Sequence, residues 1–409
     1  MSDAQFDVVV FGATSFVGQI LCQYLTDTYG VDGDLKWAAA GRSKDKLEQV
    51  KAQLGQAGSA LPLLTADAND AASLDTLCAQ TRVVISTVGP YALYGEPMIR
   101  ACVSSGTDYC DLTGEVQWIA AMLEKYEDQA KQSGARIVHC CGFDSIPSDM
   151  GTYFLQQQAR ARFKAPATRV KMRVKVAKGG VSGGTVASMM NIAEEAGKDP
   201  ALRKKLANPY LLCPPNHGFS ARQDSISMPR KDDDFGAWAA PFVMDAINSR
   251  IVHRSNALNG NAYGDNFTYN EAMLAGPGMG GRMKALGIGT GTGLFFAAAA
   301  IKPTRWLLNK FVVPQPGEGP SPEAQKAGFY DIRFFGVTDN NDSIRVKVTG
   351  DADPGYGSTA KLLGQAAACL AQDVPADAPG GFWTTSSLLG DSLLKRLQEK
   401  AGMTFTVID

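Results

Sequence analysis

The sequence predicts an α/β protein: a Rossmann-type doubly wound parallel sheet, followed by a second, α+β domain that contains a mixed or antiparallel sheet. In residues 1–150, short apolar runs alternate with amphipathic helical stretches, a pattern typical of a parallel sheet covered by helices on both faces. Beyond Met150 the pattern changes, because Val170–Val176 (VKMRVKV) and Ser343–Val348 (SIRVKV) alternate apolar and basic residues. This period of two indicates half-exposed strands of a more antiparallel sheet.

The first predicted strand, Val8–Phe11, leads into a glycine-containing turn. Gly12 ends the strand, and Gly18 follows six residues later inside an apolar-periodic helix. A strand, turn and helix in this order is the context of a dinucleotide-binding motif, whose helix N-terminus faces the pyrophosphate. The pattern here is G-x-x-S-x-x-G, and the Ser15 hydroxyl can itself bond a phosphate oxygen; an ordinary βα turn is the alternative. The predicted cofactor-binding residues of this turn are Gly12, Ala13, Thr14, Ser15, Phe16, Val17 and Gly18.

The second predicted strand, Leu35–Ala40, is followed by a turn that indicates which nicotinamide cofactor is bound. An NAD site places a carboxylate at the end of this strand, whereas a 2′-phosphate needs a cation and hydroxyl donors there. The sequence gives Arg42 and Ser43, with no acidic residue before Asp45. Because a guanidinium can bind phosphate through two hydrogen bonds, NADP(H) is favoured. A solvated Arg-Ser-Lys turn is the alternative.

Two further strands complete the predicted cofactor site. Leu61–Ala66 ends at Asp67, where the adenine edge lies in a doubly wound sheet. Val83–Val88 runs into a Gly-Pro turn that brings backbone close to the nicotinamide half of the cofactor. The cofactor-binding residues predicted on these turns are Asp67, Val88, Gly89 and Pro90.

Candidate proton donors follow the fourth, fifth and sixth predicted strands, at the carboxyl ends where open α/β sheets bind ligands. Thr107–Leu112 and Arg136–Cys140 are the last two of these strands, and the helices around them are Pro97–Ser105 and Val116–Gln132. Each candidate also has a structural explanation, since such tyrosines often pack with their hydroxyls satisfied and an Asp-Ser pair before proline can cap a helix. The four candidates are Tyr91, Tyr109, Asp144 and Ser145.

The stretch Leu286–Ile301 (LGIGTGTGLFFAAAAI) is uncharged, yet its 16 residues fall short of the ~20 that a spanning helix needs, and four glycines weaken it as a helix. A buried core segment is one interpretation. The flanks favour a second one, because cations and Trp306 bracket the run as in interfacial membrane anchors. We therefore expect residues 286–313 to make peripheral contact with a lipid surface, through glycines that let the run bend back. The flanking cations are Arg282, Lys284, Lys302, Arg305 and Lys310.

Composition argues against several other classes of protein. Lys and Arg number 40 against 41 for Asp and Glu, so no basic field for nucleic acid is expected. Eight cysteines without a C-x-x-C pair indicate a reduced, cytoplasmic protein, and three separated histidines give no metal site. The acidic start MSDAQ does not fit a signal peptide. Neither a G-x-S-x-G elbow nor a P-loop is found.

Longer motifs resemble the saccharopine dehydrogenase-like oxidoreductases, in particular the branch with the trans-acting enoyl reductases of bacterial lipid biosynthesis. They are GATSFVG, AAAGRSKDKL, STVGPYALYGEPMIRACVSSGTDYCDLTGE, CCGFDSIPSDMG, SGGTVASMMN, GDADPGYGSTAKLL and GGFWTTSSLLGDSLLKRL. The resemblance covers nearly the whole chain. It implies an NADP-binding domain at 1–150, rejoined by a helix at about 381–400, and a substrate domain at 151–380.

The resemblance also implies a function: NADPH-dependent reduction of an enoyl or keto group in a lipid or polyketide-like substrate. A saccharopine-type amino-acid dehydrogenase and a non-catalytic, cofactor-bound scaffold at a membrane surface are the alternatives. The expected partner is a small-molecule or lipid-like substrate, and a homodimer is one expected assembly. The expected location is the cytoplasm, with peripheral attachment to the inner face of the membrane or to lipid bodies.

Overall fold

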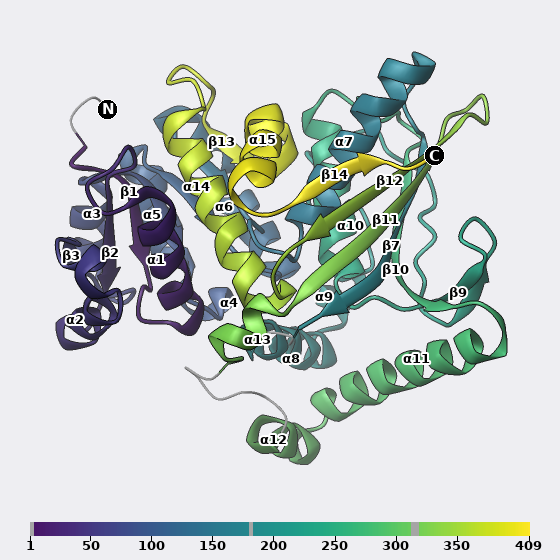
Figure 1. Ribbon diagram of the computed structural model, residues 1–409, viewed down its shortest axis with the longest axis horizontal. Helices are drawn as coiled ribbons and strands as arrows, with labels where there is room; N and C mark the ends of the chain where they lie inside the picture. Colours follow the sequence, from purple (N-terminus) through teal and green to yellow (C-terminus); the bar gives the residue numbers. More distant parts are fainter. Residues whose placement is uncertain (1–3, 180–182, 312–318) are drawn as a thin grey trace.

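The computed structural model describes residues 4–179, 183–311 and 319–409. Within these residues, two seven-stranded sheets lie side by side, with a long helix projecting along the lower edge of the molecule (Figure 1). The end of the predicted lipid-contacting segment, residues 312–313, lies outside the described residues, as do residues 314–318 of a Pro- and Gly-rich connector.

The first sheet is parallel throughout, as the sequence predicts. Its strand order is β13-β6-β5-β4-β1-β2-β3, a doubly wound arrangement with one extra strand at the β6 edge. The carboxyl ends of the strands therefore meet at one edge of the sheet. The strands are β1 (Phe6–Phe11), β2 (Trp37–Gly41), β3 (Leu63–Thr65), β4 (Thr81–Ser86), β5 (Asp108–Asp111), β6 (Arg136–Val138) and β13 (Gly381–Trp383).

Both faces of this sheet are buried, which explains its continuous apolar runs. Val8 and Val10 of β1 pack into the core on one face, whereas Val9 and Phe11 pack into a second core on the other face. The helices α1 and α14 cover the first face, and α3, α5 and α6 cover the second. The helices of this part are α1 (Phe16–Tyr29), α2 (Lys44–Gln53), α3 (Ala71–Cys78), α4 (Tyr91–Tyr94), α5 (Glu96–Ser105), α6 (Val116–Ser133), α14 (Thr359–Gln372) and α15 (Gly390–Lys400).

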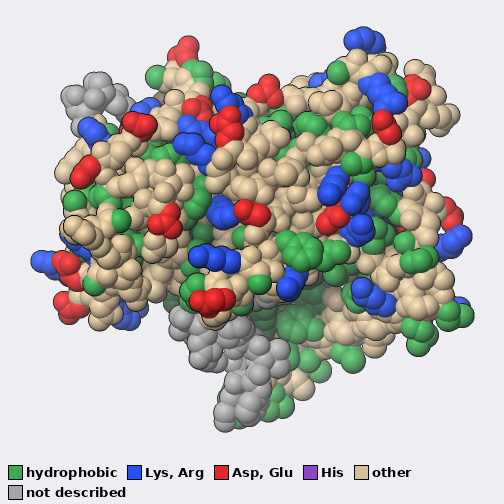
Figure 2. Space-filling view, viewed as in Figure 1, with side chains coloured by type: hydrophobic (Ala, Val, Ile, Leu, Met, Phe, Trp, Pro, Cys, Tyr) green, Lys and Arg blue, Asp and Glu red, His purple; other side chains and the backbone are tan. Residues whose placement is uncertain are grey.

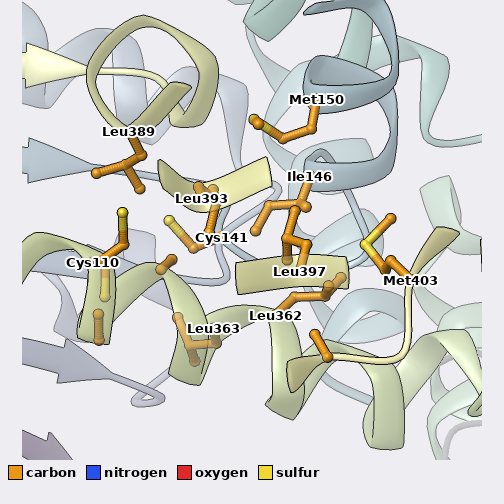
Figure 3. Packing of buried hydrophobic residues seen from close by; sticks show 14 of the residues in the cluster. Cys110, Cys141, Ile146, Met150, Leu362, Leu363, Leu389, Leu393, Leu397 and Met403 are labelled. Carbon is orange, nitrogen blue, oxygen red and sulfur yellow. The ribbon is translucent and has the colours of Figure 1, made fainter. Parts of the chain in front are cut away.

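The C-terminal part of the chain returns to the first sheet in more than one way. Strand β13 extends the sheet beside β6, and α14 packs across β1, β4 and β5. Leu389 and Leu393 meet Cys110 and Cys141 in a core that continues to Met150 on α7 (Ile146–Phe163) (Figure 3). Residues 359–372, which the sequence places in the second domain, thus contact the first sheet; the domain boundaries themselves stay a prediction.

The second sheet is mixed, with strand order β14-β12-β11-β7-β10-β9-β8. Only the β7 and β10 pair is parallel among the described strands; the other neighbours are antiparallel. The strands are β7 (Arg169–Lys178), β8 (Arg230–Asp232), β9 (Ala237–Ala240), β10 (Thr268–Gly276), β11 (Phe329–Val337), β12 (Ser343–Gly350) and β14 (Thr404–Val407). The helices around it are α7 (Ile146–Phe163), α8 (Gly183–Lys198), α9 (Pro200–Leu206), α10 (Asp245–Leu258), α11 (Gly278–Ala300), α12 (Lys302–Phe311) and α13 (Pro322–Lys326).

The alternating pattern of β7 predicts one buried and one solvated face, and the structure confirms the buried one. Val170, Met172 and Val174 enter the main core. Arg173 lies on the opposite face and is also fully buried. Its Nε donates a hydrogen bond to Asp232 at 2.7 Å, and its guanidinium lies 5.6 Å from the centroid of the Phe235 ring. A buried arginine of this kind is stable only when its charge is paired.

Candidate active site

The turn after β1 has the geometry of a phosphate-binding turn. Gly12 adopts a φ of +90°, and a Cβ placed there would lie 2.6 Å from Thr87 Oγ1. A Cβ on Gly18 would collide with the Gly12 carbonyl oxygen. Both glycines are therefore required for the close approach of turn, helix and neighbouring loop. The turn leads directly into the N-terminus of α1, the kind of position at which a dinucleotide pyrophosphate binds.

Ser15 acts in this turn as the N-cap of α1. Its hydroxyl accepts a hydrogen bond from the Gly18 backbone N–H at 2.9 Å. It also shares a 3.0 Å hydrogen bond with the Thr87 hydroxyl, which lies 2.9 Å from the Gly12 carbonyl oxygen. Sequence reasoning missed Thr87, although it stands directly after β4, where a polar side chain interrupts an apolar run. Thr87 ties the β1 and β4 turns together.

The residues predicted to select the cofactor lie at the same edge. Arg42 directly follows β2, is exposed, and has no hydrogen-bond or ion-pair partner among the described residues. Ser43 caps α2, with its hydroxyl 3.4 Å from the Lys46 N–H. Asp67 follows β3 and holds the Asn69 N–H at 2.9 Å, so its carboxylate orders its own turn. Of Arg42, Ser43 and Asp67, Arg42 is thus the residue whose side chain is available to bind a phosphate.

The two tyrosine candidates are buried, and their hydroxyl hydrogens are already used. Tyr91 donates to the Ser86 carbonyl oxygen at 2.9 Å, and Tyr109 donates to the Asp111 carboxylate at 3.1 Å. Burial raises the pKa of both phenols well above its ordinary value. Because each hydroxyl points into the protein, these two residues suit packing better than proton donation.

Asp144 is different, because it lies in the turn after β6, is half-buried, and its carboxyl has no hydrogen-bond partner among the described residues. A Cβ placed on Gly114 would lie 3.9 Å from Asp144 Oδ2, so the carboxyl faces the end of β5. Desolvation raises the pKa of Asp144 to about 7. Its neighbour Ser145 is buried and donates to Asn248 Oδ1 at 2.9 Å. Of the four candidates, Asp144 has the geometry and acidity of a proton donor near neutral pH.

Ser145 leads into a buried polar network of the second sheet. The Asn248 amide donates to Glu271 at 2.9 Å, and the Tyr269 hydroxyl donates to the same carboxyl group at 2.7 Å. Burial raises the pKa of Glu271 to about 8. Tyr269 also lines a cavity of about 640 Å³ between α10 and the segment 207–226. The network thus connects the sheet edge with the wall of this cavity, which Ile226, Phe242 and Val243 make partly apolar.

The apolar run at 286–301 forms part of one continuous helix, α11, of 23 residues. The predicted bend at the glycines is therefore wrong, and the helix is longer than its uncharged part. By length and composition it qualifies as a candidate membrane span, with a mean hydropathy of 1.2 in its most apolar window.

The core interpretation of this run is also wrong, because only 11% of that window is buried. Leu294 is 66% exposed, and Trp306 on α12 is 59% exposed. Hydrophobic side chains gather along the lower edge of the molecule (Figure 2), where Figure 1 places α11.

Two of the flanking cations have partners inside the protein. Arg305 pairs with Glu194 on α8 at 2.7 Å, and the Arg282 guanidinium lies 5.5 Å from the Trp238 ring centroid. Lys284 is exposed, whereas the side chains of Lys302 and Lys310 lie outside the described part. Arg305 is therefore better explained as a link between α12 and α8 than as a headgroup contact.

Comparison with known proteins decides the family. The profile of the saccharopine dehydrogenase NADP binding domain matches residues 8–138, which span β1 to β6. A Mycobacterium tuberculosis protein, named provisionally as a trans-acting enoyl reductase, is 39% identical over 403 residues, 96% of this chain and 95% of the relative. The chain belongs to the saccharopine dehydrogenase-like oxidoreductase family. A Mycobacterium bovis member named trans-acting enoyl reductase is 34% identical over 415 residues, 97% of this chain and 96% of that protein.

The fold agrees with membership of the saccharopine dehydrogenase-like family. The saccharopine dehydrogenase (L-Glu forming) of Saccharomyces cerevisiae superposes with a TM-score of 0.52 at 13% identity, covering 99% of this chain and 100% of that one. At this identity the likeness concerns the architecture alone. The predicted family, the α/β fold class and NADP(H) as cofactor are confirmed, and this saccharopine dehydrogenase-like protein is an NADP-dependent oxidoreductase.

Proposed function

We propose that this oxidoreductase uses NADPH to reduce an enoyl or keto group of a lipid or polyketide-like substrate. The observation that carries the proposal is the character of three segments that we propose line the substrate site: 89–94 after β4, 142–147 after β6 and 183–188 at the start of α8. They contain no Lys or Arg, and Asp144 is their one acidic residue. A site for amino-acid dicarboxylates needs cations, so a neutral substrate fits better than a saccharopine-type one.

In this proposal, the residues of the chain hold the cofactor and donate a proton to the substrate. The turn 12–18 binds the pyrophosphate, Arg42 and Ser43 bind the 2′-phosphate, and the turn 88–90 supports the nicotinamide. NADPH bound at these turns would supply the hydride for the β-carbon of an enoyl group. Asp144, protonated near neutral pH, donates the proton to the α-carbon, so that the double bond is saturated. The relatives named as enoyl reductases support this reaction class.

An NADPH oxidation assay tests this function. We expect turnover with long-chain enoyl thioesters and none with imine or amino-acid substrates. NADPH oxidation with imine substrates alone, or reduction of NADP+ with amino acids, would support the saccharopine-type alternative. Cofactor binding without oxidation of NADPH by any of the three substrate classes would support the non-catalytic scaffold.

We further propose that α11 and α12 contact a lipid surface, which places the enzyme in the cytoplasm, at the inner face of the membrane or on lipid bodies. The exposed apolar side chains Leu294, Ile301 and Trp306 support this contact. Lys284 adds an exposed cation in the N-terminal part of α11. Flotation with liposomes tests the contact. A homodimer stays a separate prediction, which light scattering at several protein concentrations tests.

A further inference from the structure

Glu115 is a fully buried carboxylate at the crevice edge, between β5 and α6. Its Oε1 accepts a hydrogen bond from the Tyr91 backbone N–H at 2.9 Å, and its Oε2 accepts one from the Ala92 N–H at 2.8 Å. These two N–H groups directly follow Gly89 and Pro90. The carboxylate therefore fixes the turn on which the nicotinamide is expected to lie. Sequence reasoning missed Glu115, although an acid in the turn after a strand of this sheet is a recognisable signal.

The same carboxylate binds a residue from a distant part of the chain. The Ser188 hydroxyl on α8 donates to Glu115 Oε1 at 2.8 Å. A second contact joins α6 and α8, in which the Gln117 side-chain amide donates a hydrogen bond to the Glu195 carboxylate at 3.2 Å. Helix α8 is thus attached to the nicotinamide side of the crevice through a buried, negatively charged acceptor.

The other end of α8 reaches the phosphate side. The Gly183 N–H donates to the Tyr356 hydroxyl at 2.9 Å, and the Tyr356 ring packs edge-on against Phe16 with centroids 4.8 Å apart. Phe16 is the first residue of α1, in the phosphate-binding turn. Helix α8 therefore connects the two halves of the dinucleotide crevice.

We propose that Glu115 is a positioning residue and that its bond to Ser188 is a latch that holds α8 against the nicotinamide turn. The inference rests on the proposed placement of the nicotinamide at residues 88–90. Among the described side chains of α8, only Met190 is buried. Most of its other described side chains are half-buried, and none belongs to the two large hydrophobic clusters, so this helix opens locally at lower free energy than a core element. A bond to a buried carboxylate is strong enough to decide whether it stays closed.

Binding of two ligands to Ser188→Ala tests the latch. NADPH carries the nicotinamide, whereas 2′,5′-ADP carries only the adenine half and the 2′-phosphate. Loss of a hydrogen bond to a charged acceptor predicts about tenfold weaker NADPH binding, read from nicotinamide fluorescence. The affinity for 2′,5′-ADP stays unchanged, because the latch lies at the other end of the crevice. Ser188→Thr, which keeps the hydroxyl, restores NADPH binding.

A matched control is Ser392→Ala on α15, which removes an exposed serine far along the chain from the latch. If Ser188→Ala does not fold, Ser188→Val against Ser188→Thr makes the same comparison with side chains of nearly equal shape. Equal loss of both ligands, or unchanged NADPH affinity, overturns the latch. Both titrations proceed without substrate, so a wild-type enzyme that fails to reduce enoyl thioesters contradicts the proposed function and leaves this comparison intact.

Discussion

Replacing Asp144 by Asn removes the carboxyl group that we propose as the proton donor while keeping its size. In the structure, desolvation raises the pKa of Asp144 from 3.8 to about 7. The folded protein thus binds this proton more tightly than the unfolded chain does. Its contribution to stability is fully present below pH 3.8 and is lost as the pH rises towards 7.

The size of the effect follows from the pKa. At 1.36 kcal/mol for each tenfold change, a pKa near 7 corresponds to about 4 kcal/mol of lost stability above pH 7. This value is an upper limit, because the side chain is partly exposed and the solvent screens part of the charge. Asp144→Asn carries no charge, so we expect it to be more stable than the wild type at pH 8 and about equally stable at pH 4.

Thermal unfolding and kinetics between pH 4 and pH 9 measure both consequences. The wild-type kcat should fall above about pH 7 as Asp144 ionises. The variant should lose about a hundredfold or more in kcat below about pH 7, in line with the loss of a general acid, and the difference should narrow at higher pH as wild-type Asp144 ionises. Asp128→Asn, at an exposed position on α6, is the control.

If the stabilities of the wild type and of Asp144→Asn change with pH in the same way, the proposed desolvated environment of this carboxyl is refuted. An unchanged kcat would refute its role as proton donor, because Asn cannot supply a proton.

Three further predictions concern the cofactor and the lipid surface. Arg42→Asp should lose most of the preference for NADP(H) over NAD(H), about 1.5–3 kcal/mol for charge-assisted bonds to the 2′-phosphate; equal affinity of the wild type for both cofactors would contradict this. Gly12→Ala should weaken NADPH binding and lower stability by about 1–3 kcal/mol, since φ is +90° and Thr87 is close; unchanged titration and melting curves would speak against it. Replacing Leu294, Phe295 and Phe296 with Ser should release the protein from liposomes with NADPH affinity intact, and continued flotation would exclude this surface.

Local sequence patterns were sufficient for the six N-terminal strands of the first sheet, but not for β13. The run at Val8–Phe11 is apolar on both faces, and the structure places alternate residues in two different cores. The glycines of the following turn could also be interpreted locally, because the need for a positive φ at Gly12 and for close approach at Gly18 arises within the motif itself.

Helix α11 shows where local propensity is misleading. Its glycines predict a weak, bent element. In the structure, two of them are contact points: a Cβ on Gly289 would lie 2.8 Å from Pro229, and one on Gly281 would collide with the Gly276 carbonyl oxygen. Close packing against β9, β10 and the preceding loop thus favours glycine at positions where propensity alone counts against it.

The missed parts of the site depend on contacts between distant residues. Ser188 lies 73 residues from Glu115, and Ser15 lies 72 residues from Thr87. No spacing rule links such pairs in a single sequence. Motifs could therefore indicate which turns carry the chemistry, whereas the side chains that hold these turns together required the structure.

The return of the C-terminal chain to the first sheet has a consequence for synthesis. Until residues beyond 383 have left the ribosome, β6 is an unpaired edge and the face of β1 later covered by α14 is exposed. An open edge and an uncovered apolar face are the features that lead nascent chains to aggregate. A fragment that ends near residue 150 would keep both features permanently. The nucleotide-binding domain is thus synthesised first but completes its folding last, and its solubility depends on synthesis of the C-terminal residues.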